Sequence, residues 1–173
     1  MPPLPSPARR PPQRIAAGRT VVDFTWDDDR WRHSVTVADR LVAESVEGGA
    51  DAAADPRWPA SPVLVEVSLA GPADHEAILA VGLAGRSHFA ASVAGDVEPD
   101  TLLFELACRL HERPCWLGST YRTGPRPEDI VRIQAPPLDD PPPATLRWAY
   151  TIGPRGIVVV ETPRRPTAGC GGR

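Results

Sequence analysis

The residues best suited to metal binding or acid–base chemistry are the four histidines His33, His75, His88 and His111. Two ligands on one face of a helix stand four residues apart, and two on one face of a strand stand two apart. No pair of these histidines has either spacing. The sequence therefore predicts no metal ion and no other bound cofactor.

The remaining reactive side chains fit no catalytic motif. The acids Asp27-Asp28-Asp29 lack the alternating ligands and central glycine of a calcium loop. No serine stands in the G-x-S-x-G frame of a nucleophile elbow, and no glycine-rich loop suits a phosphate. Cys108 and His111 are three residues apart, so a strand would point them to opposite faces. We therefore assign no catalytic residue.

A set of polar and aromatic side chains on otherwise apolar segments suggests a binding site. Arg109 could pair with Glu105 or Glu66, which would offset the cost of burying a carboxylate. A few polar groups beside aromatic walls are typical of small-ligand sites. The other interpretation is that these polar residues only form the solvent-facing side of a sheet. The candidate ligand-binding residues are Glu66, His88, Glu105, Arg109, Trp116, Tyr121 and Trp148.

Cysteine usage and apolar runs indicate the compartment. Cys108, Cys115 and Cys170 are an odd number, and residues 1–18 lack the apolar stretch of a secretory signal. Both features favour reduced thiols in a cytoplasmic protein. The longest nearly unbroken apolar run, residues 77–84, is far shorter than the roughly 20 residues of a membrane-spanning helix. We therefore expect no membrane partner.

Charge is divided unevenly along the 173 residues, whose formal net charge is −3. All 19 basic residues are arginine, so arginine itself says little about phosphate or carboxylate recognition. Seven arginines and no acid lie in residues 1–19 and 163–173, which leaves 12 arginines against 22 acids in residues 20–162. Because an acidic body repels a phosphate backbone, we expect no duplex nucleic acid as a partner.

Length and composition set the domain limits. Hydrophobic residues make up 42% of the chain, which is enough for a core, and the length fits one domain with tails. Residues 1–19 are rich in proline and arginine, and we expect a disordered tail there. Residues 20–162 form the predicted β-rich globular domain, and residues 163–173 a flexible C-terminal tail.

A β-hairpin is predicted over residues 20–37. Its two halves, 20–26 and 31–37, are rich in β-branched and aromatic residues and flank a short charged turn. A four-residue turn fixes the register of the two strands. The predicted cross-strand pairs are Trp26–Trp31, Phe24–His33 and Val22–Val35.

Three segments with clear alternation or strong β character follow, at residues 63–69, 78–84 and 88–94. Before them, residues 41–47 suit a strand or a short helix, and a strand continues the meander better. In the hairpin of the second and third segments Leu83 is predicted to face His88, and Gly82 to face Phe89. An aromatic ring over a strand glycine covers exposed backbone.

Residues 101–111 have two interpretations. Alternate positions from Leu102 to Leu110 are all apolar, which favours a strand. A helical stripe with Asp100 as its cap would also fit. The β-like segment 115–122 that follows favours a strand paired with it in a hairpin.

The C-terminal third is predicted to hold a short edge strand, a proline-rich loop and a hairpin. The edge strand is residues 130–133, and the loop lies at 137–143. Residues 145–152 and 156–162 flank a Gly-Pro-Arg-Gly turn and form the hairpin. Nine or ten short strands in a meander predict a mostly β protein, an antiparallel β-barrel or β-sandwich with at most one short helix.

The function predicted from these features is that of a soluble, non-enzymatic module that binds a small molecule or a partner protein. The alternative is a hydrolase or isomerase that uses His88 or His111 with Glu66 or Glu105 as acid and base. A third possibility is a structural or assembly subunit, which a large flat apolar patch would favour.

Overall fold

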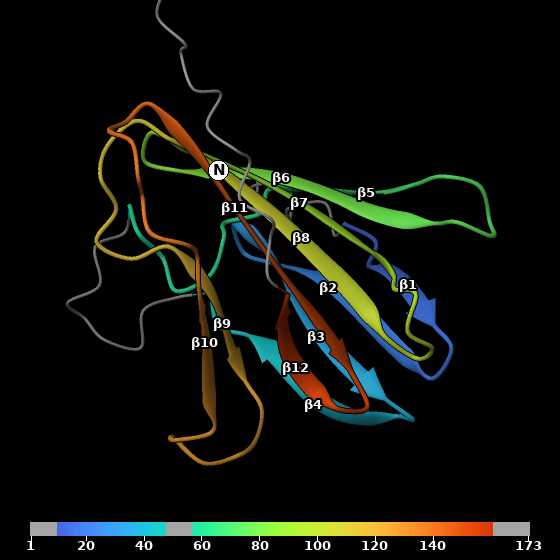
Figure 1. The fold of residues 1–173 in the computed structure, drawn as a ribbon. Helices are drawn as coiled ribbons and strands as arrows, with labels where there is room; N and C mark the ends of the chain where they lie inside the picture. The colour runs from blue at the N-terminus through green and yellow to red at the C-terminus, as the bar shows by residue number, and fades with distance from the viewer. Residues whose placement is uncertain (1–9, 48–56, 161–173) are drawn as a thin grey trace, which may run out of the picture.

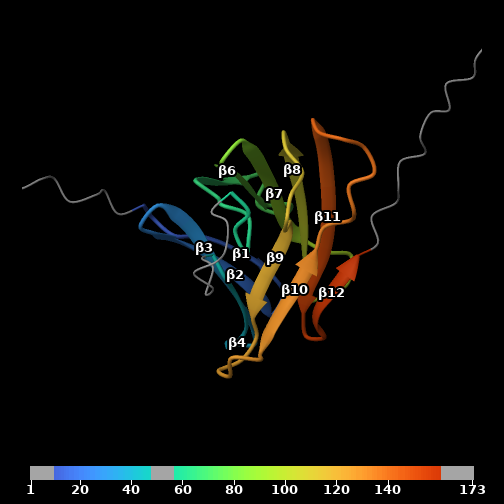
Figure 2. The ribbon, with the colours of Figure 1, turned by 90° about the vertical axis from the view of Figure 1, so that its left-hand side faces the viewer.

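The computed structural model describes residues 10–47 and 57–160 and arranges them in twelve strands that form two packed antiparallel sheets (Figures 1 and 2). Sheet A has the order β1-β2-β3-β4-β9-β10, and sheet B the order β12-β11-β8-β7-β6-β5. The strands of sheet A are β1 (Gln13–Ala17), β2 (Thr20–Asp27), β3 (Arg30–Val37), β4 (Arg40–Ser45), β9 (Gly118–Arg122) and β10 (Ile130–Gln134). The strands of sheet B are β5 (Glu66–Ala70), β6 (Ala77–Ala84), β7 (Ser87–Gly95), β8 (Leu102–Leu110), β11 (Ala144–Gly153) and β12 (Gly156–Val160). The predicted fold class is confirmed, in its sandwich form.

The core lies between the two sheets, because alternate residues of each strand point inward. β2 contributes Val22 and Phe24, while β8 contributes Leu102 and Phe104, all of them fully buried. Cys108, also on β8, is buried among them. No described residue is helical, and so no described helix is long and apolar enough to cross a membrane.

The predicted hairpin of β2 and β3 is confirmed in its register, but Asp27 and Arg30 also pair, so the turn is residues 28–29 and not the four residues expected. All three predicted pairs are present, and the rings of Trp26 and Trp31 lie 5.7 Å apart with an edge-to-face geometry. Residues 40–45 form the strand β4, as the meander argument predicted, and no helix. Local turn chemistry and alternation were therefore sufficient to place these three strands.

The hairpin of β6 and β7 also has the predicted register, with Leu83 opposite His88 and Gly82 opposite Phe89. The position that a Cβ of Gly82 would occupy, however, lies 1.8 Å from the carbonyl oxygen of Val63. Glycine is needed here because the segment before β5 crosses directly over β6.

This crossing segment ties the two sheets together. The amide of Trp31 in sheet A donates to the carbonyl oxygen of Leu64 at 2.8 Å, and the amide of Val65 donates to that of Val81 in sheet B at 2.9 Å. The predicted strand 63–69 accordingly starts only at Glu66 as β5. Trp58, just before the segment, is buried and extends the core.

The strand interpretation of residues 101–111 is confirmed by β8, but the predicted hairpin with residues 115–122 is wrong. β8 lies between β7 and β11 in sheet B, whereas β9 lies between β4 and β10 in sheet A. Both long neighbours of β8 pair with it along nearly its whole length, and this leaves no edge for β9. β9 instead pairs with β4, where Tyr121 faces Ser45.

Two further expectations need correction. Gln13–Ala17, expected to belong to a disordered tail, form β1 and pair with β2, since their apolar residues alternate into the core. The chain also crosses between the sheets three times, and so it is no simple meander. Residues 1–9 and the predicted tail 163–173 lie outside the described residues.

The C-terminal predictions are confirmed. β10 is a short edge strand of sheet A, and β11 and β12 form the last hairpin around the Gly-Pro-Arg-Gly turn. Residues 137–143 contain no strand. β12 is consequently the edge of sheet B opposite to β5.

Candidate functional site

The seven predicted site residues fall into two groups that do not line one pocket. Glu66, His88, Glu105 and Arg109 are exposed on the outer face of sheet B. Trp116 is half-buried before β9, and its indole donates to the carbonyl oxygen of Ala60 at 3.3 Å. The second group also includes Tyr121 and Trp148, whose side chains are buried in the core.

Only two of the four polar residues on the outer face are direct neighbours, because β6 and β7 lie between Glu66 on β5 and the residues of β8. His88 on β7 faces Arg109 on β8, and Ser92 faces Glu105. Ser92 Oγ donates to the Glu105 carboxylate at 3.3 Å. Arg109, predicted to pair with Glu105 or Glu66, instead donates to Thr145 Oγ1 on β11 at 3.4 Å.

Large aliphatic side chains occupy the same outer face. Along β6, Leu79, Val81 and Leu83 point outward and are 46% to 53% exposed. On the neighbouring strands Val81 faces Ala90, and Ala90 in turn faces Ala107. The result is an apolar centre, which we call the β6 face, bordered by Glu66, His88, Glu105 and Arg109.

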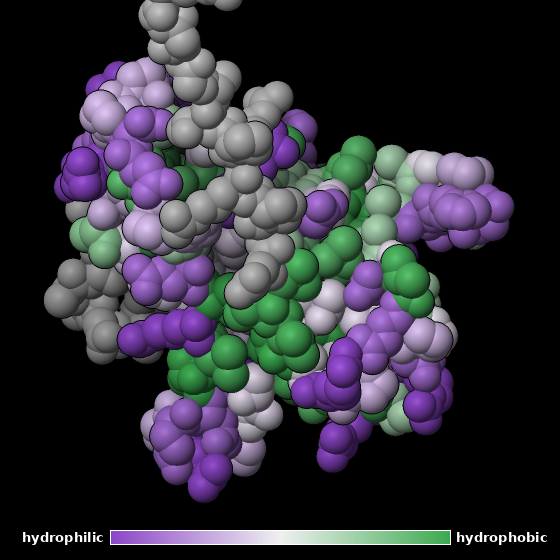
Figure 3. Space-filling model, viewed as in Figure 1, coloured by the Kyte–Doolittle hydropathy of each residue, from purple (hydrophilic) through white to green (hydrophobic). Residues whose placement is uncertain are grey.

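Exposed apolar residues concentrate on sheet B. Of the nine large hydrophobic residues exposed in the described part of the chain, seven belong to β5, β6 and β12. In Figure 3, which looks onto the outer side of sheet B, green residues gather around β11 and β12 and again around β6. These seven are Leu69, Leu79, Val81, Leu83, Val158, Val159 and Val160.

Between the sheets lies a hydrogen-bonded chain of polar groups that was not predicted. His33 Nε2 lies 2.7 Å from the Tyr121 hydroxyl, which lies 2.7 Å from the hydroxyl of Tyr150. His33 stacks on Phe24, its predicted cross-strand partner, with ring centroids 4.9 Å apart. Alternation with Trp31 and Val35 already placed His33 on the inward face and could have revealed this chain.

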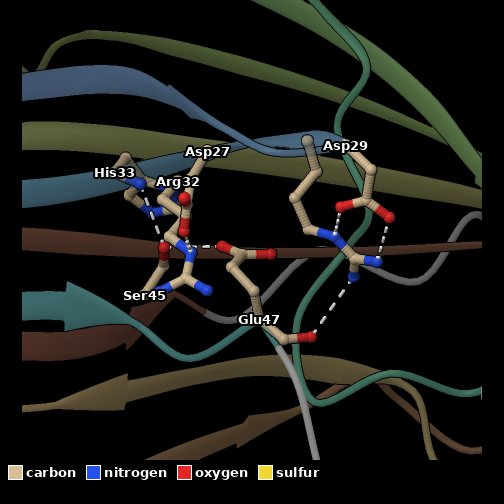
Figure 4. Close-up of polar contacts among 7 residues, drawn as sticks. Asp27, Asp29, Arg32, His33, Ser45 and Glu47 are labelled. Atoms are coloured by element: carbon tan, nitrogen blue, oxygen red, sulfur yellow. Dashed lines mark hydrogen bonds and ion pairs between the residues drawn. The ribbon is translucent and has the colours of Figure 1, made fainter.

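A second polar contact joins β3 to the end of β4 (Figure 4). The backbone amide of His33 donates to Ser45 Oγ at 3.0 Å, and Ser45 Oγ donates to Glu47 Oε1 at 2.6 Å. Glu47 Oε2 is buried and has no hydrogen-bond partner. Glu47 is thus a carboxyl group held inside the fold by a single side-chain hydroxyl.

Burial changes the titration of this cluster. Desolvation raises the pKa of Glu47 to about 7 and lowers that of His33 to about 4. Desolvation also raises the pKa of Tyr150 to about 12, and it holds the pKa of Tyr121 well above its ordinary value. At neutral pH His33 is therefore an uncharged ring. Nε2 of this ring shares a hydrogen bond with the Tyr121 hydroxyl, whereas its buried Nδ1 has no hydrogen-bond partner among the described residues.

Two of the three acids at the β2–β3 turn form ion pairs with arginines. Asp27 lies 2.6 Å from Arg32, and Asp29 lies 2.7 Å from Arg30. Figure 4 shows Arg32 beside Asp27 and near Glu47. Among the described residues no group of three or more histidine, cysteine or acidic side chains could hold a metal ion.

Comparison with known proteins gives no family for this chain: no family model, no curated protein and no solved structure matches it. The surface of the sandwich itself therefore carries the functional argument. Its most unusual feature is the β6 face.

Proposed function

We propose that this protein is a non-enzymatic β-sandwich module that binds a partner protein on the β6 face. The observation that carries the proposal is the outward row Leu79, Val81 and Leu83, with polar residues on its borders. The outer face of an antiparallel sheet that meets only water normally presents polar side chains. Here every second position of β6 presents a large or small aliphatic side chain instead.

The layout of the β6 face matches that of protein interfaces. Such interfaces have an apolar centre that becomes fully buried and a polar rim that stays near solvent. Val81, Ala90 and Ala107 form a flat centre, and Glu66 and Arg109 lie at its borders. Large exposed apolar patches with polar rims mark interaction sites.

We expect the charged residues of the rim to orient the bound partner and to add little to its binding affinity. Glu66, Glu105 and Arg109 are all exposed, and exposed pairs contribute little free energy. Both signs of charge are present, so a complementary partner would carry basic groups opposite Glu66 and Glu105 and an acid opposite Arg109. An open sheet face suits a protein better than a small molecule, because ligand pockets are concave and enclose most of their ligand.

The experiment is site-specific photo-crosslinking with a benzophenone amino acid at Val81, in the cells that make this protein. We expect a discrete light-dependent adduct. The matched control is the same amino acid at Leu41, which is 55% exposed on β4 of sheet A. Adducts of equal yield from both positions would mean non-specific contact and would overturn the proposal.

A second arm tests whether the apolar row itself makes the contact. With the crosslinker at Val81, the change Leu83→Glu should abolish the adduct, because it places a charge in the apolar centre. Leu41→Glu should leave the adduct unchanged. An adduct that persists in the Leu83→Glu variant would contradict binding on the β6 face.

A further inference from the structure

The two sheets have four edge strands, and three of them carry features that discourage pairing with another strand. Proteins protect sheet edges with charges, prolines or covering segments. β10 has Arg132 at its centre and is soon followed by Pro136 and Pro137. β1 follows two prolines and contains Arg14.

The third protected edge is β5. It begins with the charged Glu66 and ends at Gly71-Pro72. Arg10 reaches the chain just before β5, where it donates to the carbonyl oxygen of Val65 at 2.7 Å. The backbone at the start of this edge is therefore already engaged.

β12 has none of these protections within the strand itself, and Pro154 and Pro163 stand outside it in the sequence. Its sequence, Gly156-Ile157-Val158-Val159-Val160, contains no charge and no proline. Val159 is 61% exposed on one face of the strand, and Val158 and Val160 are exposed on the other. No described residue pairs with its outer edge.

We propose that β12 pairs antiparallel with β12 of a second copy of this chain, so that the two B sheets become one continuous sheet. The pairing of identical antiparallel strands creates a two-fold axis and a closed dimer. With the axis at Val158, that residue faces its own symmetry mate, and Ile157 faces Val159. The central cross-strand pairs are then β-branched and apolar, the kind of pair that stabilises a sheet, and Gly156 faces Val160 at each end.

The charge pattern identifies a second copy as the occupant. Pairing of two β10 strands, which have the same length as β12, would set Arg132 against Arg132. Like charges directly opposite each other destabilise a sheet. Self-pairing of β12 meets no such repulsion, and it buries valines on both faces of the strand. Among the described edge strands, β12 is the one that contains no charged residue.

This inference does not depend on the proposed function. β12 and β6 are separated by three strands in sheet B, so a copy at the β12 edge leaves the β6 face open. The photo-crosslinking result at Val81 and the oligomeric state can therefore fail separately.

The test is sedimentation equilibrium of the purified full chain, with a reductant that keeps the exposed Cys115 from cross-linking. We expect a monomer–dimer equilibrium for the unchanged chain. In Val159→Lys the two-fold axis introduces the charge twice, and we expect the dissociation constant to rise at least about tenfold. The matched control Leu41→Lys adds the same charge at an exposed site of sheet A and should dimerise normally.

Hydrogen exchange supplies a second measurement that needs no variant. Amides of residues 156–160 should exchange more slowly in concentrated than in dilute protein, while those of β10 should not change. A chain that stays monomeric when concentrated would overturn the proposal. So would a dimer that Val159→Lys does not weaken, or one that protects β6 and leaves β12 unchanged.

Discussion

His33 and Glu47 are buried titratable residues whose pKa values move in opposite directions for the same reason. Water is excluded from both, and exclusion disfavours the charged form of each. Glu47 therefore retains its proton to about pH 7, and His33 stays neutral down to about pH 4. The two effects on stability oppose each other across the mildly acidic range.

Replacing Glu47 by glutamine should change how stability depends on pH. The pKa of Glu47 rises from an ordinary 4.5 to about 7 on folding, so the folded state binds the proton more tightly. This group therefore makes the protein less stable as pH rises from 4.5 to 7, by up to roughly 3 kcal/mol. We expect the free energy of unfolding of Glu47→Gln, relative to the unchanged chain, to rise over that window in urea titrations.

The control for this measurement is Glu44→Gln, which removes an exposed carboxyl on β4, the strand just before Glu47. Its free energy of unfolding should run parallel to that of the unchanged chain. A Glu47→Gln profile that also runs parallel would show that Glu47 carries its charge without penalty.

His33→Phe should show the opposite trend. The pKa of His33 falls from 6.5 to about 4 on folding, so stability is lost as pH drops through this range. Phenylalanine retains the stacking between Phe24 and Phe104 but does not titrate. Relative to the unchanged chain, the variant should gain up to roughly 3 kcal/mol between pH 6.5 and pH 4.

Its matched control is His75→Phe in the exposed turn after β5. That variant should show no such gain. A constant offset between His33→Phe and the unchanged chain at all pH values would mean that the His33 ring accepts a proton inside the fold as easily as in water.

The residue scale was only partly predictable. The hairpin register placed Phe24 opposite His33, because the pairs follow from turn length. The contact of His33 with Tyr121 was not predictable, because the two residues are 88 positions apart and β9 comes near β3 only by pairing with β4 in sheet A. Tyr121 itself was selected as a site residue, but for a pocket with a different set of neighbours.

At the scale of elements, β6 shows how one glycine fixes the path of the chain. Gly82 leaves room for the carbonyl oxygen of Val63, and the segment that includes Val63 bonds to β3 and β6. A side chain at this position would push the crossing segment away from both sheets.

Gly82→Ala should therefore destabilise the fold by more than about 2 kcal/mol, since the added Cβ meets backbone atoms that cannot move alone. Gly95→Ala, at the end of β7, is the matched control. Its Cβ would lie 3.7 Å from that of Ala17, an ordinary contact, and the change should stay within about 0.5 kcal/mol. Equal thermal shifts for the two variants would contradict this account of Gly82.

Hairpins were predictable and the partners of lone strands were not. Strand pairs joined by two-residue turns, such as β2–β3 and β6–β7, follow from alternation and turn residues. β9 follows the longer connection of residues 111–117, whose sequence does not indicate which sheet the next strand joins. β1 was missed because the prolines before it and the arginines around it resemble those of a disordered tail. Its residue Ile15 is nevertheless buried in the core.

For the whole molecule, the many apolar, alternating segments were enough to predict a sandwich. They were not enough to predict which strands belong to which sheet. Which strands belong together depends on the three crossings, β4 to β5, β8 to β9, and β10 to β11. The site prediction depended on that division. Four of its residues lie together on the outside of sheet B because β5 to β8 are consecutive, whereas the aromatic ones were carried into or beside the core by β9 and β11.

The late arrival of β9 sets an order for assembly during translation. A nascent chain that has emerged as far as Leu110 already holds every sheet partner of β5, β6 and β7, but β4 still waits for the strand that will close its free side. The ribosome must deliver residues 118–122 before His33 can meet the hydroxyl of Tyr121. Until then, sheet A lacks β9 and β10 and sheet B lacks β11 and β12, so each layer has four of its six strands.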